Sequence, residues 1–299
     1  MNVDQFPRWV QQQQIDVEAA LSRWVPADAP AGIGEVMRYA VLDGGKRLRP
    51  LLALAGCEAV GGDRSVALRA AVAVELIHAY SLVHDDLPCM DNDVLRRGKP
   101  TVHVRYGEAQ AMLAGDAMQA LAFEVLTPDE GVPPVLAARL VALLARASGH
   151  AGMAGGQAID LASVGHRLDE ACLRDMHRRK TGVLLQASVL MGALCASPQA
   201  QVDPQVWQAL TDYGAAIGLA FQVVDDILDC TQDSEVLGKT AGKDADQNKP
   251  TFVSLLGLEA AQAHAQALRE KAHQALARAG LAQAAHLASL ADKIVERDN

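Results

Sequence analysis

The chain has 299 residues, of which 50% are hydrophobic, 21% are charged and only 4% are aromatic, and 54 of them are alanine. This composition excludes general disorder, and it argues against an all-β fold because alanine favours helices while strand-favouring aromatic residues are scarce. The 27 basic and 36 acidic residues give a net charge of −9, so we expect no nucleic-acid binding driven by phosphate contacts.

Apolar residues recur at three- and four-residue spacing along most of the chain, which predicts helices. Asp203-Pro204 supplies an N-cap followed by proline at the first helical position, and Gly280 interrupts the last segment. Because no low-complexity linker divides the chain, we predict a single all-α domain over residues 1–299, with ten or more helices. The predicted segments are, in chain order, residues 8–24, 33–42, 66–84, 108–126, 134–148, 170–196, 204–229 and 252–296.

The cysteines and the apolar stretches bear on location. The five cysteines are widely spaced and form no CxxC pair, so the sequence predicts neither a disulfide framework nor a zinc site. The N-terminal segment lacks the apolar core of a signal peptide, and we expect the protein in the reducing cytoplasm. The most membrane-like stretch, residues 181–197, is short for a span and is followed by Pro198. We therefore expect a helix buried in the core and no membrane insertion.

An acidic cluster follows the apolar segment 70–83. Four carboxylates fall within the nine residues Asp85–Asp93, and they repel one another unless cations neutralise them. Clustered oxygen ligands suit magnesium, particularly where a phosphate completes the coordination. Pro88 cannot donate the helical hydrogen bond to the His84 carbonyl, so we expect a break or bulge that turns Asp91 back towards Asp85. The alternative interpretation is an acidic loop that caps a surface helix.

A second acidic cluster, Asp225-Asp226-Ile227-Leu228-Asp229, continues another apolar helical segment. Asp225 and Asp229 are four residues apart and share a helix face, and Asp226 lies beside them. Unpaired carboxylates in such a segment would be costly. Two clusters of this kind on separate helices favour metal binding over a purely structural role.

Two basic patches complement the acidic clusters. In the first, Lys46, Arg47 and Arg49 follow a glycine pair, which predicts a turn whose backbone approaches an anion, although the spacing of a P-loop is absent. The second patch, RRGKPT at 96–101, follows the first acidic cluster closely. Arginine forks bind diphosphate oxygens well, so this patch would lie beside the metal site. Either patch alone is more often only solvated charge.

Seven motifs are distributed along the chain between residues 44 and 251. They are, in order, GGKRLRP at 44–50, LIHAYSLVHDDLPCMDND at 76–93, RRGKPTVH at 96–103, MAGGQAIDL at 153–161, KTG at 180–182, FQVVDDILD at 221–229 and GKTAGKDADQNKPT at 238–251. In this order they resemble the short-chain trans-isoprenyl diphosphate synthases, and within that family the bacterial farnesyl diphosphate synthases (geranyltranstransferases). Motifs of this length and number make a chance match negligible. The resemblance implies the isoprenoid synthase fold, an all-α bundle around a deep central cavity, usually as a homodimer.

The resemblance also implies an activity: magnesium-dependent condensation of isopentenyl diphosphate with dimethylallyl or geranyl diphosphate, giving farnesyl diphosphate and diphosphate. Three Mg²⁺ ions would bind the allylic diphosphate. The implied metal ligands are Asp85, Asp86 and Asp91 for two ions, and Asp225, Asp226 and Asp229 for the third. The implied contacts to the allylic diphosphate are Arg96, Lys180, Thr181, Gln222, Lys239 and Lys249. The implied contacts to isopentenyl diphosphate are Lys46, Arg49, His78 and Arg97.

Arg96, Lys180, Thr181 and Gln222 are the implied catalytic residues, because the two cations would neutralise the leaving diphosphate and the other two side chains would stabilise the allylic cation. Product length is expected to depend on Tyr80, which lies five residues before Asp85 and thus about 7.5 Å further along the helix axis. Ser81 shares the face of Asp85 but is too small to obstruct a hydrocarbon tail. Helical geometry makes Tyr80 a flank of the tunnel, and the resemblance implies that an aromatic residue there limits elongation.

Three alternatives remain open at the sequence level. A synthase of the same family with ten- or twenty-carbon products would carry the same motifs. A terpene cyclase shares the fold and a first aspartate cluster, but it usually has an Asn/Asp-Ser/Thr-Glu motif where this chain has residues 225–229. A catalytically silent partner subunit would tend to lose its aspartate clusters, and both are intact here.

Overall fold

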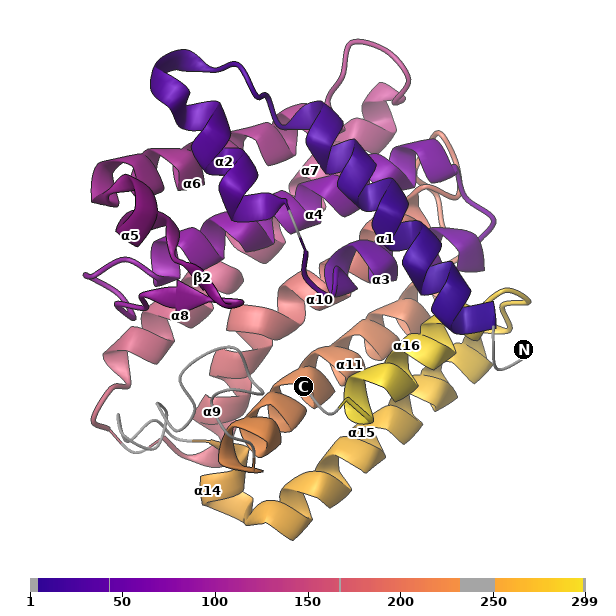
Figure 1. The fold of residues 1–299 in the computed structure, drawn as a ribbon. Helices are drawn as coiled ribbons and strands as arrows, with labels where there is room; N and C mark the ends of the chain where they lie inside the picture. The colour runs from indigo at the N-terminus through magenta and orange to yellow at the C-terminus, as the bar shows by residue number, and fades with distance from the viewer. Residues whose placement is uncertain (1–4, 43, 167, 232–250, 298–299) are drawn as a thin grey trace.

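Alanine- and leucine-rich segments form helices throughout residues 5–42, 44–166, 168–231 and 251–297, which are the residues that the computed structural model describes (Figure 1). One short antiparallel hairpin accompanies them, formed by β1 (Leu95–Arg96) and β2 (Lys99–Pro100). The helices are α1 (Gln5–Trp24), η1 (Pro30–Gly32), α2 (Ile33–Val41), α3 (Leu48–Ala59), α4 (Arg64–Asp85), α5 (Val102–Tyr106), α6 (Glu108–Leu126), α7 (Pro134–Ser148), α8 (Met153–Ala162), α9 (Glu170–His177), η2 (Arg178–Gly182), α10 (Val183–Leu194), α11 (Pro204–Thr231), α14 (Phe252–Leu256), α15 (Leu258–Ala279) and α16 (Ala285–Val295). The predicted all-α fold is confirmed.

The strongly periodic segments form helices close to the predicted bounds, and α6 and α7 match them at both ends. The N-cap before α11 is confirmed, because Asp203 Oδ1 accepts hydrogen bonds from the backbone N–H groups of Gln205 and Val206. Gly280 ends α15 in the left-handed conformation that favours glycine, with φ +62°. The segment 170–196 is interrupted by η2, a π-helical turn that includes the KTG motif.

The helix α3 was not predicted, and its sequence LRPLLALAGCEA explains why. Nearly all of its residues are buried, so the segment is apolar on every side and shows no helical period. It packs closely on α10 through glycine: a Cβ on Gly56 would lie 2.5 Å from the Val189 carbonyl oxygen, and one on Gly192 would collide with the Ala53 carbonyl oxygen. The shorter helices α5 and α8 were also missed.

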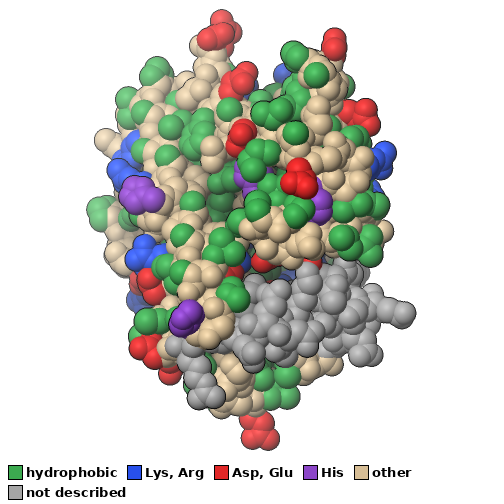
Figure 2. Space-filling view, turned by 90° about the vertical axis from the view of Figure 1, so that its left-hand side faces the viewer, with side chains coloured by type: hydrophobic (Ala, Val, Ile, Leu, Met, Phe, Trp, Pro, Cys, Tyr) green, Lys and Arg blue, Asp and Glu red, His purple; other side chains and the backbone are tan. Residues whose placement is uncertain are grey.

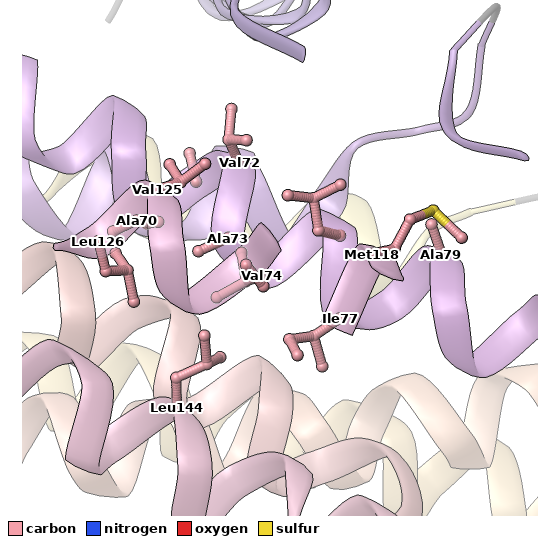
Figure 3. Close-up of a cluster of buried hydrophobic side chains, with 14 of the residues drawn as sticks. Ala70, Val72, Ala73, Val74, Ile77, Ala79, Met118, Val125, Leu126 and Leu144 are labelled. Carbon is pink, nitrogen blue, oxygen red and sulfur yellow. The ribbon is translucent and has the colours of Figure 1, made fainter. Parts of the chain in front are cut away.

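The core forms two clusters of buried side chains that meet along α3 and α10. One cluster joins α1, α2, α4, α6 and α7, and Figure 3 shows part of it, including Ile77 of α4 and Met118 of α6. The other joins α10 and α11 with α15 and α16. This arrangement places the end of α4 and the end of α11, which carry the two acidic clusters, on rigid buried helices.

Among the described helices, α4 has the length and the mean hydropathy, 1.6, that a membrane span would need. Of its most apolar 18-residue window, 72% is buried inside the protein, and a buried core helix meets the same criteria. The stretch 181–197, which the sequence singled out instead, forms the end of η2 and the whole of α10. Its burial in the core is confirmed, since most of α10 from Leu184 to Leu194 is inaccessible.

Candidate active site

The first acidic cluster lies where α4 ends. The helix stops at Asp85, and the backbone N–H of Asp91 donates to the Asp85 carbonyl oxygen at 2.8 Å, so the chain turns back as predicted. Burial raises the pKa of Asp85 to about 6 against the opposing charge of Lys180, and the charges of Asp91 and Asp86 raise it further. A bound cation would stabilise these carboxylates, and their oxygen atoms suit Mg²⁺.

Asp86, the next residue after Asp85, is bound to an arginine instead. Its side chain is only 3% exposed, and its two oxygen atoms accept hydrogen bonds from Arg96 Nε and Nη2 at 2.9 and 2.6 Å. This forked ion pair joins the end of α4 to β1. The metal-binding role expected of Asp86 stays a prediction. In this structure its carboxylate pairs with Arg96, and the pair anchors Arg96 beside the first acidic cluster.

The second acidic cluster lies near the C-terminal end of α11, and here too the first aspartate is more exposed than the second. The side chain of Asp225 is 41% exposed and lies 3.3 Å from Arg297 Nη2. Asp226 is buried, and its Oδ2 atom accepts a hydrogen bond from the backbone N–H of Phe252 at 2.7 Å. The metal-binding role expected of Asp226 likewise stays a prediction. Asp229 is half-buried one helical turn after Asp225.

No group of three or more His, Cys, Asp or Glu side chains converges as a ready-made metal site among the described residues. The first cluster thus offers Asp85 and Asp91, and the second offers Asp225 and Asp229. Magnesium is usually held by one or two carboxylates together with substrate phosphates. This donor set therefore fits Mg²⁺ that binds with a diphosphate rather than in a closed protein cage.

The four residues implied for isopentenyl diphosphate lie close enough to affect one another's charge. Burial lowers the pKa of Arg49 to about 10, and Arg97 lowers it further despite the opposing charge of Glu75. Burial, together with Arg49 and Arg97, holds the pKa of His78 well below its usual range. Burial also lowers the pKa of Lys46, and Arg97 is among the charges that contribute. Such a cluster of cations is stabilised by a bound anion.

Glycine and a left-handed residue shape this cationic cluster. Arg97 donates to the Gly44 carbonyl oxygen at 3.0 Å, and a Cβ on Gly45 would lie 2.7 Å from Arg97 Nη1. Arg47, at φ +51°, turns inward instead, and its Nη1 atom lies 2.6 Å from Glu75 Oε1. Arg47, the middle cation of the first basic patch, therefore anchors the loop. The buried Nε atom of Arg49 has no hydrogen-bond partner among the described residues.

The KTG motif forms the π-helical turn η2, a type of distortion that occurs frequently at functional sites. Two glycines allow neighbouring helices to reach it. A Cβ on Gly156 of α8 would collide with the Lys180 backbone nitrogen, and one on Gly218 of α11 would lie 2.7 Å from the Gly182 Cα. Lys180 Nζ lies 2.5 Å from Asp160 Oδ2, and its charge also acts on Asp85. Thr181 is buried beside it.

Gln222 lies on α11 one turn before Asp225. Its Nε2 atom is 2.9 Å from Nδ1 of His177, the last residue of α9. The charges of Lys180 and Asp225 both act on His177. The η2 turn thus lies between the two acidic clusters. Lys180 of η2 interacts with Asp85 of the first cluster, and His177, which directly precedes η2, contacts Gln222 next to the second cluster.

The two residues expected to bear on chain length are on α4. Tyr80 is buried, and its ring meets that of His84 edge-on at a centroid distance of 5.7 Å. His84 lies directly against Gly115 of α6, where a Cβ would collide with the imidazole. Ser81 Oγ donates to the His78 carbonyl oxygen at 2.9 Å, so its hydroxyl is turned back to its own helix. Lys239 and Lys249 lie outside the described residues.

Three residues of the site were missed by sequence reasoning. Asp160 lies within a quoted motif, MAGGQAIDL, but its pairing with Lys180 depends on the packing of α8 on η2. His177 precedes a basic run and carried no signal of its own. Arg297, near the C-terminus, donates to the Phe221 carbonyl oxygen at 2.8 Å and lies over the Phe221 ring at 4.0 Å. Nothing in the local sequence marks Arg297 as a neighbour of Asp225.

Comparisons with known proteins agree with this geometry. A family described as polyprenyl synthetase matches residues 30–287. A geranylgeranyl pyrophosphate synthase of Capsicum annuum is 47% identical over 296 residues, which is 98% of this chain and 79% of that protein. The solved apo structure of an FPP/GFPP synthase from Zymomonas mobilis is 41% identical with a TM-score of 0.85, covering 97% of this chain and 98% of that one. A Helicobacter pylori geranyltransferase, solved in complex with magnesium and isoprenyl diphosphate, is 33% identical with a TM-score of 0.84, covering 98% and 97%.

Proposed function

Since the chain belongs to the polyprenyl synthetase family and is a trans-prenyltransferase, we propose that it condenses isopentenyl diphosphate with dimethylallyl or geranyl diphosphate to give farnesyl diphosphate and diphosphate. One observation supports this proposal: a cationic cluster around His78 and an acidic cluster around Asp85, each suited to a diphosphate in its own way, lie along the last turns of α4. The first is the cationic cluster around Arg49 and Arg97. The second is acidic and lies around Asp85 and Lys180, where a metal is needed before a diphosphate can bind.

The acidic side suits an allylic diphosphate bound through three Mg²⁺ ions. Asp85 and Asp91 would hold two of them, and Asp225 with Asp229 would hold the third. When bound, the ions supply the positive charge that neutralises the leaving diphosphate. The protein adds Lys180 and Arg96 on the same side, and Lys239 and Lys249 are proposed to complete the contacts.

The reaction breaks the carbon–oxygen bond of the allylic diphosphate and leaves a delocalised allylic cation. The double bond of isopentenyl diphosphate then forms the new carbon–carbon bond, and a proton leaves its C2 atom for the released diphosphate. The amide of Gln222 and the hydroxyl of Thr181 stabilise the cation through their dipoles. The buried alanine- and leucine-rich helices exclude water, which would otherwise quench the cation.

In this proposal the fifteen-carbon product depends on Tyr80. The ring is buried and is braced by His84, which itself lies against α6. A close-packed wall of this kind resists displacement by another five-carbon unit. A twenty-carbon product is the second candidate, and the name of the Capsicum annuum relative favours it.

One assay separates these possibilities. Purified protein is incubated with Mg²⁺, isopentenyl diphosphate and dimethylallyl diphosphate, and the dephosphorylated products are identified by mass spectrometry. We expect the fifteen-carbon alcohol as the main product. A twenty-carbon alcohol would support the geranylgeranyl alternative, a cyclic hydrocarbon would support a cyclase, and the absence of any product would refute the proposal.

We further propose that the protein is a cytoplasmic homodimer. Its five cysteines are free, as expected in a reducing compartment. Val104 of α5 and Met112 and Leu113 of α6 are 43 to 53% exposed, and hydrophobic side chains gather on the face that Figure 2 shows. A second copy of the chain would cover apolar surface of this kind. Leu113→Glu should lower the mass in solution to that of one chain, whereas Val135→Glu, at another exposed apolar position, should not.

A further inference from the structure

Gln222 is held by a histidine to which the proposed reaction gives no role. Gln222 Nε2 lies 2.9 Å from Nδ1 of His177. In this orientation the amide nitrogen donates and Nδ1 accepts, which places the imidazole proton on Nε2, a buried atom with no hydrogen-bond partner among the described residues. His177 therefore holds the nitrogen end of the amide, and the carbonyl end is directed away from the imidazole.

The surroundings of His177 keep the imidazole neutral. The residue is buried, and burial lowers its pKa to about 4 against the opposing charge of Asp160. At neutral pH the ring therefore has a nitrogen lone pair to offer. A protonated ring would donate from Nδ1 and would favour the reversed amide, with the carbonyl oxygen of Gln222 facing the histidine.

Phe252 fixes the imidazole ring in place. The two rings stack with their centroids 5.5 Å apart and their planes inclined by 25°. Phe252 is fully buried, and its backbone N–H donates to Asp226, which lies one turn after Gln222 on α11. Both residues are thus held in place relative to α11: Gln222 is part of this helix, and His177 stacks on Phe252, which is bound to it through Asp226. His264 lies on Phe252 at 6.0 Å but makes no such link to Gln222.

We propose that His177 is a positioning residue, which holds the Gln222 amide so that its carbonyl oxygen faces the allylic cation. The proposal rests on the proposed prenyl transfer. A carbonyl oxygen carries negative partial charge and stabilises a cation, whereas the N–H groups of a reversed amide would oppose it. An amide fixed before the reaction needs no reorientation in the transition state.

The test compares two isosteric substitutions. Asparagine and leucine have nearly the same shape, and both lose the ring, but asparagine retains an acceptor near the position of Nδ1. We expect His177→Leu to lower kcat by about tenfold or more, the cost of losing one oriented hydrogen bond at the transition state. KM for isopentenyl diphosphate should stay within about twofold, because Gln222 is not among the residues expected to contact that substrate. His177→Asn should retain most of kcat.

His264→Leu is the matched control, since it also removes a ring from Phe252 but leaves Gln222 untouched. Its kcat should remain near that of the unmodified protein. Equal losses in His177→Asn and His177→Leu, or a loss in the control as large as in His177→Leu, would mean that His177 only packs and would overturn the proposal. A loss expressed mainly in KM would overturn it as well.

A double-mutant cycle separates this inference from the proposed function. Gln222→Met removes the amide, so His177→Leu should have no further effect on kcat in that background. Additive losses in an enzyme that does make prenyl diphosphates would refute the positioning role alone. An unmodified protein without prenyl transfer would refute both. If His177→Leu does not fold, as judged by circular dichroism, His177→Phe replaces it, because phenylalanine keeps a ring on Phe252 and lacks an acceptor. It should lower kcat in the unmodified background and have no further effect in Gln222→Met; an unchanged kcat in the unmodified background would overturn the proposal.

Discussion

The two acidic clusters share a sequence pattern, a pair of adjacent aspartates followed by a third, and they share a division of labour. In each pair the second aspartate is buried and bound to another part of the protein. Asp86 forms an ion pair with Arg96, and Asp226 accepts a hydrogen bond from the backbone N–H of Phe252. In each pair the first aspartate remains half-buried or partly exposed at the site. The partners differ, since one is a charged side chain and the other a backbone amide.

This comparison teaches that a run of carboxylates need not be a run of ligands. One member of each pair stabilises the segment that carries the others: Asp86 joins α4 to β1, and Asp226 joins α11 to α14. We expect the remaining carboxylates to bind metal ions when a diphosphate brings the other oxygen ligands. The clusters therefore predict separable effects of mutation, on turnover for one kind of aspartate and on stability for the other.

The largest expected effect is on turnover. Asp225→Ala should lower kcat by about a thousandfold, because the leaving diphosphate loses part of its charge neutralisation. Folding should survive, as the residue is partly exposed and the change relieves carboxylate repulsion. Turnover is measured at saturating Mg²⁺, with circular dichroism for the fold. Asp212→Ala is the control, on the same helix but paired with Arg278 at the surface; near-normal turnover of Asp225→Ala would contradict the assignment.

Next comes the selective loss of one substrate. Arg49→Ala should raise KM for isopentenyl diphosphate by about tenfold to a hundredfold, the cost of one charge-assisted contact, and should change KM for the allylic substrate much less. Lys180→Ala should show the opposite preference. Steady-state kinetics with each substrate varied in turn measures both. If the two changes affect both substrates equally, the division into two diphosphate sites is wrong.

Stability should distinguish the two members of the first pair. Asp86→Asn should lower the free energy of unfolding by about 2 kcal/mol, less than for a fully buried ion pair because the Arg96 side chain is 32% exposed. Asp91→Asn, which removes a charge that repels Asp85, should stay within about 0.5 kcal/mol. Urea unfolding in metal-free buffer measures both. An equal loss for the two variants would remove the proposed difference.

The pH dependence of stability tests whether His177, which contacts Gln222 next to the second acidic cluster, is buried in its neutral form. The pKa of His177, about 4 in the folded protein, lies below the ordinary value of 6.5. The unfolded chain therefore binds more protons between these values, so the contribution is complete above pH 6.5 and is lost as the pH falls towards 4. Between pH 7 and pH 5 the unmodified protein should lose about 2 kcal/mol through this group. Urea unfolding at both pH values should show a loss smaller by that amount in His177→Asn; the same loss in both proteins would exclude this origin.

The smallest expected effect on rate is at Tyr80, where the change is in the product. Tyr80→Ala should keep activity within a few fold and shift products from fifteen carbons to twenty or more, because the wall beside the growing tail is opened. Products are measured under excess isopentenyl diphosphate. Ser81→Ala is the control, as its hydroxyl already faces its own helix backbone. If fifteen carbons remains the only product of Tyr80→Ala, this residue is not the limit.

Sequence reasoning succeeded where the signal is local. The periodic segments gave α6 and α7 with their bounds, and Pro88 indicated the turn that brings Asp91 back to Asp85. It failed where burial removes the period, as in α3, whose apolar residues face neighbours on all sides. The resemblance supplied residues for both diphosphate sites, and the structure brings Lys46, Arg49, His78 and Arg97 into one cluster.

The roles of individual aspartates could not be predicted, because they depend on partners distant in sequence. Asp226 meets Phe252, and Asp225 meets Arg297, 72 residues further along the chain. The inward turn of Arg47 likewise depends on Glu75, which the pattern of basic residues does not include. Such contacts follow from helix packing rather than from the motif in which each residue occurs.

The most direct test of the comparison is to locate the metal ions. Crystals grown with Mn²⁺, isopentenyl diphosphate and an unreactive thio analogue of the allylic diphosphate would reveal each ion by its anomalous scattering. We expect ions on Asp85 and Asp91 and a further ion on Asp225, with Asp86 still paired to Arg96 and Asp226 still bound to the Phe252 backbone. Direct coordination of an ion by Asp86 or Asp226 would contradict the division of labour within the two clusters.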